Sequence, residues 1–168
     1  MAQRPSHRLN LYLVPSDPER TLDPASVEQG LSLLRADGVL DGMRPGPRAA
    51  ALIEGGFALV RLDAPTQPTL YGNRQGGYRV RCPACGGSAV TPALDALKAW
   101  RLGGARAATC PACGAATALE ALDYAPFAAP GRFALELRDV GGASVAPDAT
   151  RSLEVALGGA FVVVGSRG

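Results

Sequence analysis

Two copies of one pentapeptide constrain this chain more than any other feature of its sequence. Residues 82–86 and residues 110–114 both read C-P-A-C-G, and together they contain all four cysteines. Two residues between ligands let one tight turn aim both thiolates at a single ion. The proline presets φ for that turn, and the glycine tolerates strained φ so that backbone N–H groups can face the sulfurs. The sequence therefore predicts a metal site with a tetrahedral shell of four sulfurs, formed by Cys82, Cys85, Cys110 and Cys113.

Two disulfides are the alternative use of four cysteines. The spacing argues against them, because a C-x-x-C pair bonded to itself closes a very short loop, and the chain opens with no secretory signal. We therefore favour the metal site.

The paired C-P-x-C-G motifs resemble the zinc ribbon group of metal sites, over about residues 78–118. The resemblance implies one structural Zn²⁺ but no particular function, since ribbons occur in many classes of protein. The arm, which is the segment between the two motifs, departs from the family pattern. It places 24 residues between Cys85 and Cys110, more than in the usual ribbon, and these residues contain a predicted helix.

Iron is the alternative metal, because rubredoxin-like electron carriers present the same paired motifs and four sulfurs suit either ion. Rubredoxins pack several aromatic side chains around the iron, whereas here Tyr71, Tyr78 and Trp100 are the only ones near in sequence. Zinc is therefore favoured. Four protein ligands leave no open coordination position, so we expect a structural site.

The N-terminal part of the chain predicts a β-α-β unit. Leucines alternate over 8–14, which indicates an edge or half-buried strand. Asp23-Pro24 begins a helix that ends at Asp37-Gly38, with Leu22 and Val27 placed as a hydrophobic staple. Residues 57–62 form the second strand, and 49–53 are its pairing partner or its lead-in.

The C-terminal part predicts a second β-α-β unit. Residues 133–137 alternate as a strand, and 160–164 form an apolar strand. Between them, 149–157 is a helix, because a proline precedes it and two glycines follow it, although its apolar residues also alternate as in a strand.

Two such units around an insertion predict an α+β fold, a ferredoxin-like β-α-β/β-α-β sandwich with a zinc-ribbon insertion. The split scaffold comprises 1–66 and 130–168, and the insertion comprises 67–129. Within the insertion a helix begins at Thr91-Pro92 and ends at Gly103-Gly104. Its apolar stripe is Leu94, Leu97 and Trp100, with Trp100 predicted to lie in the core.

Charge is uneven along a chain whose formal net charge is only +2. Residues 71–118 hold six basic side chains and one acid, Asp95, although four thiolates and Zn²⁺ together remove part of this excess. We expect a contact surface for a protein partner at Arg79, Arg81, Arg101 and Arg106, with Tyr78 beside it. Nucleic acid is the alternative partner, and an ordinary solvated face paired with scaffold acids is the third interpretation.

No motif for catalysis is present. His7 is the single histidine, and there is no G-x-S-x-G or phosphate-binding loop. Acid pairs such as Glu136 and Asp139 are interpreted as solvated surface. We therefore expect a non-enzymatic, cytoplasmic protein of bacterial type, without a membrane segment, in which an edge strand allows a dimer.

Overall fold

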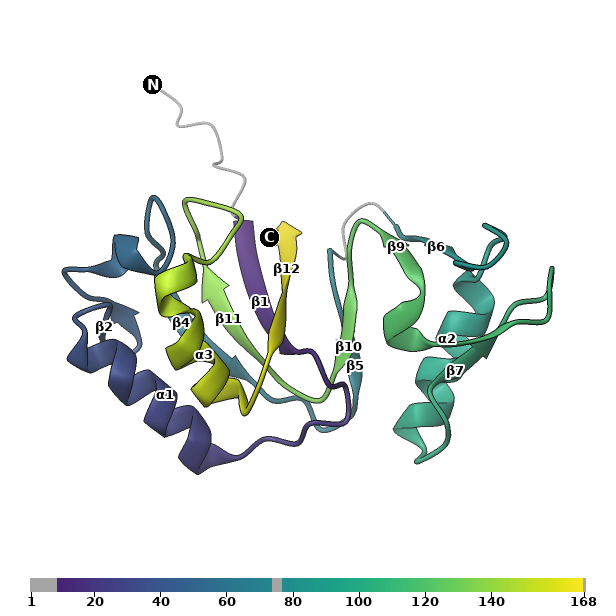
Figure 1. The fold of residues 1–168 in the computed structure, drawn as a ribbon, viewed down its shortest axis with the longest axis horizontal. Coiled ribbons are helices and arrows are strands. Elements are labelled where there is room, and N and C mark those ends of the chain that lie inside the picture. The colour runs from purple at the N-terminus through teal and green to yellow at the C-terminus, as the bar shows by residue number, and fades with distance from the viewer. Residues whose placement is uncertain (1–8, 74–76, 168) are drawn as a thin grey trace, which may run out of the picture.

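A four-stranded antiparallel sheet forms the centre of the fold in the computed structural model, which describes residues 9–73 and 77–167 (Figure 1). The strand order is β12-β1-β11-β4. The strands are β1 (Leu9–Pro15), β4 (Leu59–Asp63), β11 (Ala134–Arg138) and β12 (Phe161–Arg167).

Two helices, α1 (Pro24–Ala36) and α3 (Thr150–Leu157), pack side by side on one face of this sheet (Figure 1). The first connects β1 to β4 and the second connects β11 to β12. This order of strands and crossovers confirms the predicted α+β, ferredoxin-like sandwich. The two helices approach closely because Gly30 faces the backbone of Ala156.

The two scaffold helices form where the sequence predicted them. Asp23 is the N-cap of α1, and its carboxylate accepts a hydrogen bond from the Ala25 N–H at 3.1 Å. Residues 150–157 are helical rather than extended, and Gly158 ends α3 in the left-handed conformation with φ of 76°.

In the N-terminal unit the structure decides two alternatives that the sequence left open. Residues 49–53 do not pair with β4, because η1 (Ala49–Ala51) is a single 3₁₀ turn. The outer edge of β4 instead receives a short hairpin, β2 (Leu40–Asp41) with β3 (Arg44–Pro45), and the Val60 N–H donates to the Met43 carbonyl. The first strand is half-buried rather than an edge strand, since β1 lies between β12 and β11.

A two-stranded ribbon covers part of the other face of the sheet. It pairs β5 (Thr69–Tyr71) with β10 (Ala129–Gly131), the segments by which the chain leaves and re-enters the scaffold. The buried side chains beneath and within it are Val14, Tyr71, Ala129, Ala134 and Val164. The sheet therefore has apolar side chains on both faces: those toward the helices lie in the main core, and those toward the ribbon lie in this second, smaller core.

The metal lobe, residues 79–125, lies beyond this ribbon (Figure 1). Its elements are β6 (Arg79–Arg81), α2 (Val90–Arg101), β7 (Ala107–Thr109), β8 (Ala116–Ala118), η2 (Leu119–Ala121) and β9 (Asp123–Ala125). They enclose a separate small core of nine buried residues, four of them alanines. The predicted domain limits at 67 and 129 stay a prediction.

The lobe helix confirms one sequence prediction and corrects two. Trp100 is 3% exposed and lies in the lobe core, as predicted. The helix begins at Val90, one residue before the predicted start at Thr91-Pro92. Leu94 does not belong to the buried stripe, since it is 51% exposed. Over the described ranges no helix combines the length and the apolar character needed to cross a membrane.

Candidate metal centre

Each C-P-A-C-G segment folds into the same tight turn, called a knuckle here. In the first knuckle the Gly86 N–H donates to the Cys82 carbonyl at 2.8 Å, and in the second the Gly114 N–H donates to the Cys110 carbonyl at 2.8 Å. Both glycines have positive φ, 73° and 74°. Because a side chain disfavours this conformation, the glycine after the second cysteine is what closes each turn.

The two knuckles face each other and bring four thiols together. All four Sγ atoms lie within 4.8 Å of one another. The Sγ atoms of Cys82 and Cys113 are 3.8 Å apart, and those of Cys85 and Cys110 are 3.6 Å apart. A tetrahedral site with Zn–S bonds of about 2.3 Å has sulfur–sulfur edges of about 3.8 Å. The donor set therefore fits a metal ion bound by four thiolates.

The cysteines form no disulfide. All four are free thiols, and their separations far exceed a disulfide bond of about 2.05 Å. The disulfide alternative is therefore wrong.

Backbone N–H groups and neighbouring sulfurs shift the pKa values of two of these thiols in opposite directions. The N–H groups of Cys113 and Ala112 lower the pKa of Cys110 to about 7. The Gly87 N–H, 3.4 Å from the Cys85 sulfur, also favours a thiolate there, but hydrogen bonds with Cys113 and Cys110 outweigh it and raise the pKa of Cys85 to about 12. One thiolate is thus stabilised by the fold, whereas a full set of four needs a bound cation.

Burial is divided evenly between the two turns. The first cysteine of each knuckle, Cys82 or Cys110, is buried, and the second, Cys85 or Cys113, is exposed. Gly87 packs directly behind the cluster, because a Cβ atom there would lie 3.2 Å from the Cys85 sulfur. The site is therefore at the surface of the metal lobe, backed on one side by the protein.

Strands lead into both knuckles, and the long arm between them is a structural element. β6 precedes the first knuckle, and the β7–β8 hairpin carries the second. The arm contains α2, which packs against both β6 and β7. The departure from the usual ribbon is therefore an inserted helix, which supplies four of the nine buried residues of the lobe core.

The four predicted contact arginines fall into two groups. Arg101 donates from Nε to the Pro68 carbonyl at 2.8 Å. Arg106 is ion-paired with Glu19 of the scaffold at 2.6 Å and with Glu120 at 3.0 Å. These two side chains hold the metal lobe to the scaffold and to itself.

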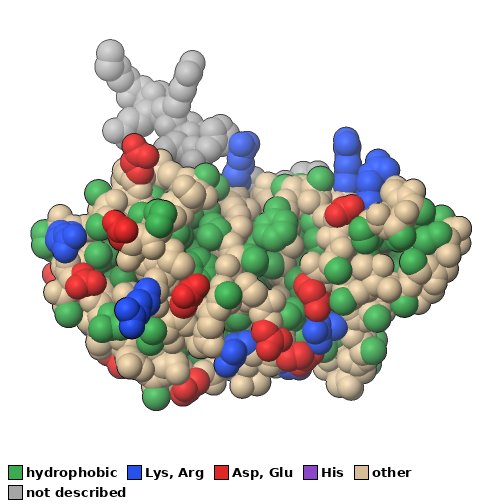
Figure 2. Space-filling model, in the orientation of Figure 1, with side chains coloured by type: hydrophobic (Ala, Val, Ile, Leu, Met, Phe, Trp, Pro, Cys, Tyr) green, Lys and Arg blue, Asp and Glu red, His purple; other side chains and the backbone are tan. Residues whose placement is uncertain are grey.

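The remaining two, Arg79 and Arg81, are exposed on β6 and flank the buried Val80. Arg81 donates to the Gly86 carbonyl at 3.0 Å, across the first knuckle. In the part of the chain that the structure describes, no salt bridge involves either arginine. Figure 2 shows basic side chains projecting from the upper edge of the metal lobe.

Sequence reasoning missed one charged residue entirely. Glu136, interpreted as solvated, is 2% exposed and accepts from the Arg61 Nε at 2.7 Å. Its place between Leu135 and Leu137 puts it on the second face of the sheet by alternation, but no sequence signal shows that this position is buried. His7 and Arg74 lie outside the described residues.

Comparison of the chain with protein-family models, with curated proteins and with solved structures finds no match.

Proposed function

We propose that this chain binds one Zn²⁺ at Cys82, Cys85, Cys110 and Cys113 as a structural centre, and that the metal lobe is a protein-interaction module. The observation that carries the proposal is the close cluster of four thiols at tetrahedral separations. Four protein ligands complete the shell of zinc and leave no position for a substrate, so the ion serves folding rather than catalysis.

Zinc is needed because the lobe has little core of its own. Its buried set is small and rich in alanine, and each alanine buries little apolar area. An ion bound by both knuckles joins the segment before α2 to the segment after it, and its binding free energy becomes folding free energy.

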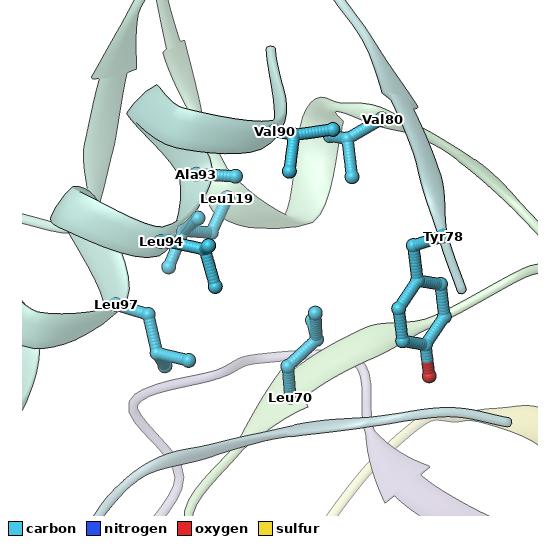
Figure 3. Close-up of a pocket in the computed structure, with 8 residues that line it drawn as sticks. All are labelled: Leu70, Tyr78, Val80, Val90, Ala93, Leu94, Leu97 and Leu119. Atoms are coloured by element: carbon cyan, nitrogen blue, oxygen red, sulfur yellow. The ribbon is translucent and has the colours of Figure 1, made fainter. Parts of the chain in front are cut away.

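The interaction half of the proposal rests on an apolar cavity beside α2. It has a volume of about 180 Å³. Figure 3 shows side chains of α2 converging on it from one side, with Tyr78, Val80 and Leu70 opposite. Leu94 is 51% exposed and Val90 is 37% exposed at its rim. Exposed apolar residues around a concavity are typical of an interaction site.

The occupant we propose is a segment of a partner protein that inserts one aliphatic or aromatic side chain and carries acidic residues beside it. An exposed cation near the cavity supports this choice: Lys98 lies one helical turn beyond Leu94, is 72% exposed and has an exposed contact of 3.8 Å with Asp95. Arg79 and Arg81 lie on the face of β6 opposite to Val80 and add positive charge to the same lobe. Nucleic acid has less support, because Arg101 and Arg106 are already engaged in internal contacts.

Elemental analysis of the purified full chain tests the metal half. We expect about one zinc per chain and no visible colour, with loss of the metal in Cys85→Ser. Ser88→Ala is the matched control, because Ser88 is exposed beside the same knuckle and ligates nothing. Iron with visible absorption would establish the electron-carrier alternative, and metal-free protein with oxidised thiols would overturn the proposal.

Paired exposed leucines test the interaction half. Leu94→Ser alters the cavity, whereas Leu102→Ser alters a leucine that is 88% exposed and outside the cavity. We expect a co-purifying protein that is retained by the parent chain and by Leu102→Ser but lost with Leu94→Ser. The proposed role of the cavity would be contradicted if all three chains retained the same proteins, or if the parent chain retained none.

A further inference from the structure

Among the residues that the structure describes, the second face of the central sheet is only half covered. The β5–β10 ribbon covers the half that carries Val14, Ala134 and Val164. Over the other half lies a polar cavity of about 340 Å³, between the sheet and the end of the ribbon. Its volume lies within the range of small-molecule sites, and its sheet lining comes from all four strands.

Three hydrogen-bonding side chains form one row across this open half. Ser166 is paired with Asn10 in the β12–β1 register. Because Leu11 is paired with Leu137 in the β1–β11 register, Asn10 lies beside Arg138 on the next strand. Side chains directly opposite each other in an antiparallel sheet share a face. Ser166, Asn10 and Arg138 therefore point into the same cavity, and all three line it.

Each member of this row has a donor to offer. The Asp139 N–H donates to the Asn10 Oδ1 at 3.1 Å, which fixes the amide so that its NH₂ group is left for the cavity. The Arg138 Nε is buried but makes no hydrogen bond within the described residues. The guanidinium contributes up to five donors in a planar fork, and the serine contributes a hydroxyl.

A buried carboxylate holds the arginines in place. Glu136 lies 2.7 Å from the Arg61 Nε and 3.4 Å from the Arg138 Nε. One carboxylate is therefore shared by two guanidinium groups, Oε2 facing Arg61 and Oε1 facing Arg138. Asp63 contacts Arg61 at 3.7 Å and lies opposite Ala134, four residues along β11 from Arg138. With Arg167, the cavity lining holds three arginines against these two carboxylates, so it keeps a net positive charge.

An aromatic and apolar surface adjoins the row. Tyr12, the next residue of β1 on this face, lies with its ring centroid 5.2 Å from that of Tyr71 on the ribbon. Leu70 adds an aliphatic side chain to the same lining. A flat organic body next to the donors would cover these groups and remove apolar area from water.

From these observations we infer that the cavity binds a small organic oxyanion, a carboxylate or phosphate group on a body about the size of one aromatic ring. The oxyanion accepts hydrogen bonds from Arg138, Asn10 and Ser166, and the ring lies against Tyr12 and Leu70. An arginine fork suits both anions, because it matches the spacing of two oxygens on one atom. This site is separate from the metal centre and does not depend on the proposed zinc.

Three matched probes test the inference on the metal-loaded full chain: benzoate, phenyl phosphate and the neutral isostere benzamide. Each is titrated while the amide spectrum is recorded by NMR. We expect saturable shifts at the Asn10 side-chain amide and the Ser166 backbone amide with at least one anion, and at least tenfold weaker binding of benzamide. The stronger of the two anions distinguishes a carboxylate ligand from a phosphate ligand.

Variants separate a built site from general attraction to arginine. Arg138→Met keeps the aliphatic stem and should weaken the anion at least tenfold, about the loss expected for a charge-assisted hydrogen bond. Ser166→Ala should weaken it a few-fold and serves if Arg138→Met does not fold. Arg151→Met, at an exposed position on α3, is the control and should change nothing. No saturable binding of either anion, equal binding of benzamide, or an unaltered dissociation constant in both site variants would overturn the inference.

Discussion

Replacing Gly30 with alanine tests how tightly the two scaffold helices are packed. A Cβ atom at Gly30 would lie 2.4 Å from the Cβ of Ala156, 2.5 Å from its nitrogen and 2.6 Å from its Cα. Two of these three atoms are backbone, so no rotation of a side chain relieves the overlap. The helices must move apart, and the apolar residues between them lose contact.

Two effects of opposite sign set the size of the change. Alanine favours a helix interior over glycine by about 1 kcal/mol. Overpacking of a close contact costs about 1–3 kcal/mol, and the backbone neighbours place this contact at the upper end. The free energy of unfolding should therefore fall by about 2 kcal/mol, which corresponds to a melting temperature about 4–8 °C lower for a chain of this size.

Urea unfolding at a fixed zinc concentration is the suitable assay, because bound metal shifts apparent stability by mass action. Gln29→Ala is the control in the same helix; this side chain is exposed, so the change should stay within about 0.5 kcal/mol. A more stable Gly30→Ala chain would refute the reasoning, since it would mean that helix propensity decides the outcome and that the helices are not in backbone contact.

Three further predictions concern the metal, the core and pH. A chelator should lower the melting temperature of the parent chain by about 10 °C or more and leave that of Cys110→Ser unchanged; equal responses would show that the cysteines hold no stabilising ion. Leu153→Ala should lose about 2–5 kcal/mol, since Leu153 is 2% exposed, whereas the exposed Leu33→Ala should lose less than about 0.5 kcal/mol, and similar losses from urea curves would contradict the assigned core. The hydrogen bond from Arg132 lowers the pKa of Glu19 in the folded chain, so Glu19 contributes stability above its unfolded pKa, and this contribution is lost as the pH falls through the folded value. The melting temperature should therefore decline less between pH 6 and pH 3 in Glu19→Gln than in the parent. Parallel curves of melting temperature against pH would contradict the assigned role of Glu19.

Much of the scaffold could be predicted from sequence because local signals there agree with tertiary packing. Asp23 caps a helix that has an apolar stripe. The sequence of 149–157 was compatible with a helix or a strand, and Gly158, which ends α3, is the local signal that favoured the helix. The cysteines were equally clear, since the spacing of both knuckles and the glycine after each is a local requirement of a metal turn.

Features that depend on long-range pairing were missed. β5 and β10 are three residues each, too short for any periodicity, and they exist only because they pair with each other over the sheet. Glu136 has an ordinary sequence context, and only its neighbours on adjacent strands show that its carboxylate is buried. The distribution of the arginines is similar: Arg106 meets Glu19 across 87 positions of the chain.

Leu70 belongs to the lining of both cavities, the apolar one beside α2 and the polar one on the sheet. Its strand, β5, is paired only with β10. A ligand that displaces the Leu70 side chain in one cavity therefore changes the lining of the other. Two ligands that each set the position of Leu70 are thermodynamically linked, and the factor by which the first alters the affinity of the second equals the factor by which the second alters the first. A protein segment bound to the metal lobe would thus alter the affinity of the scaffold for its small molecule, and the small molecule would alter the affinity of the lobe for that segment, through the position of Leu70.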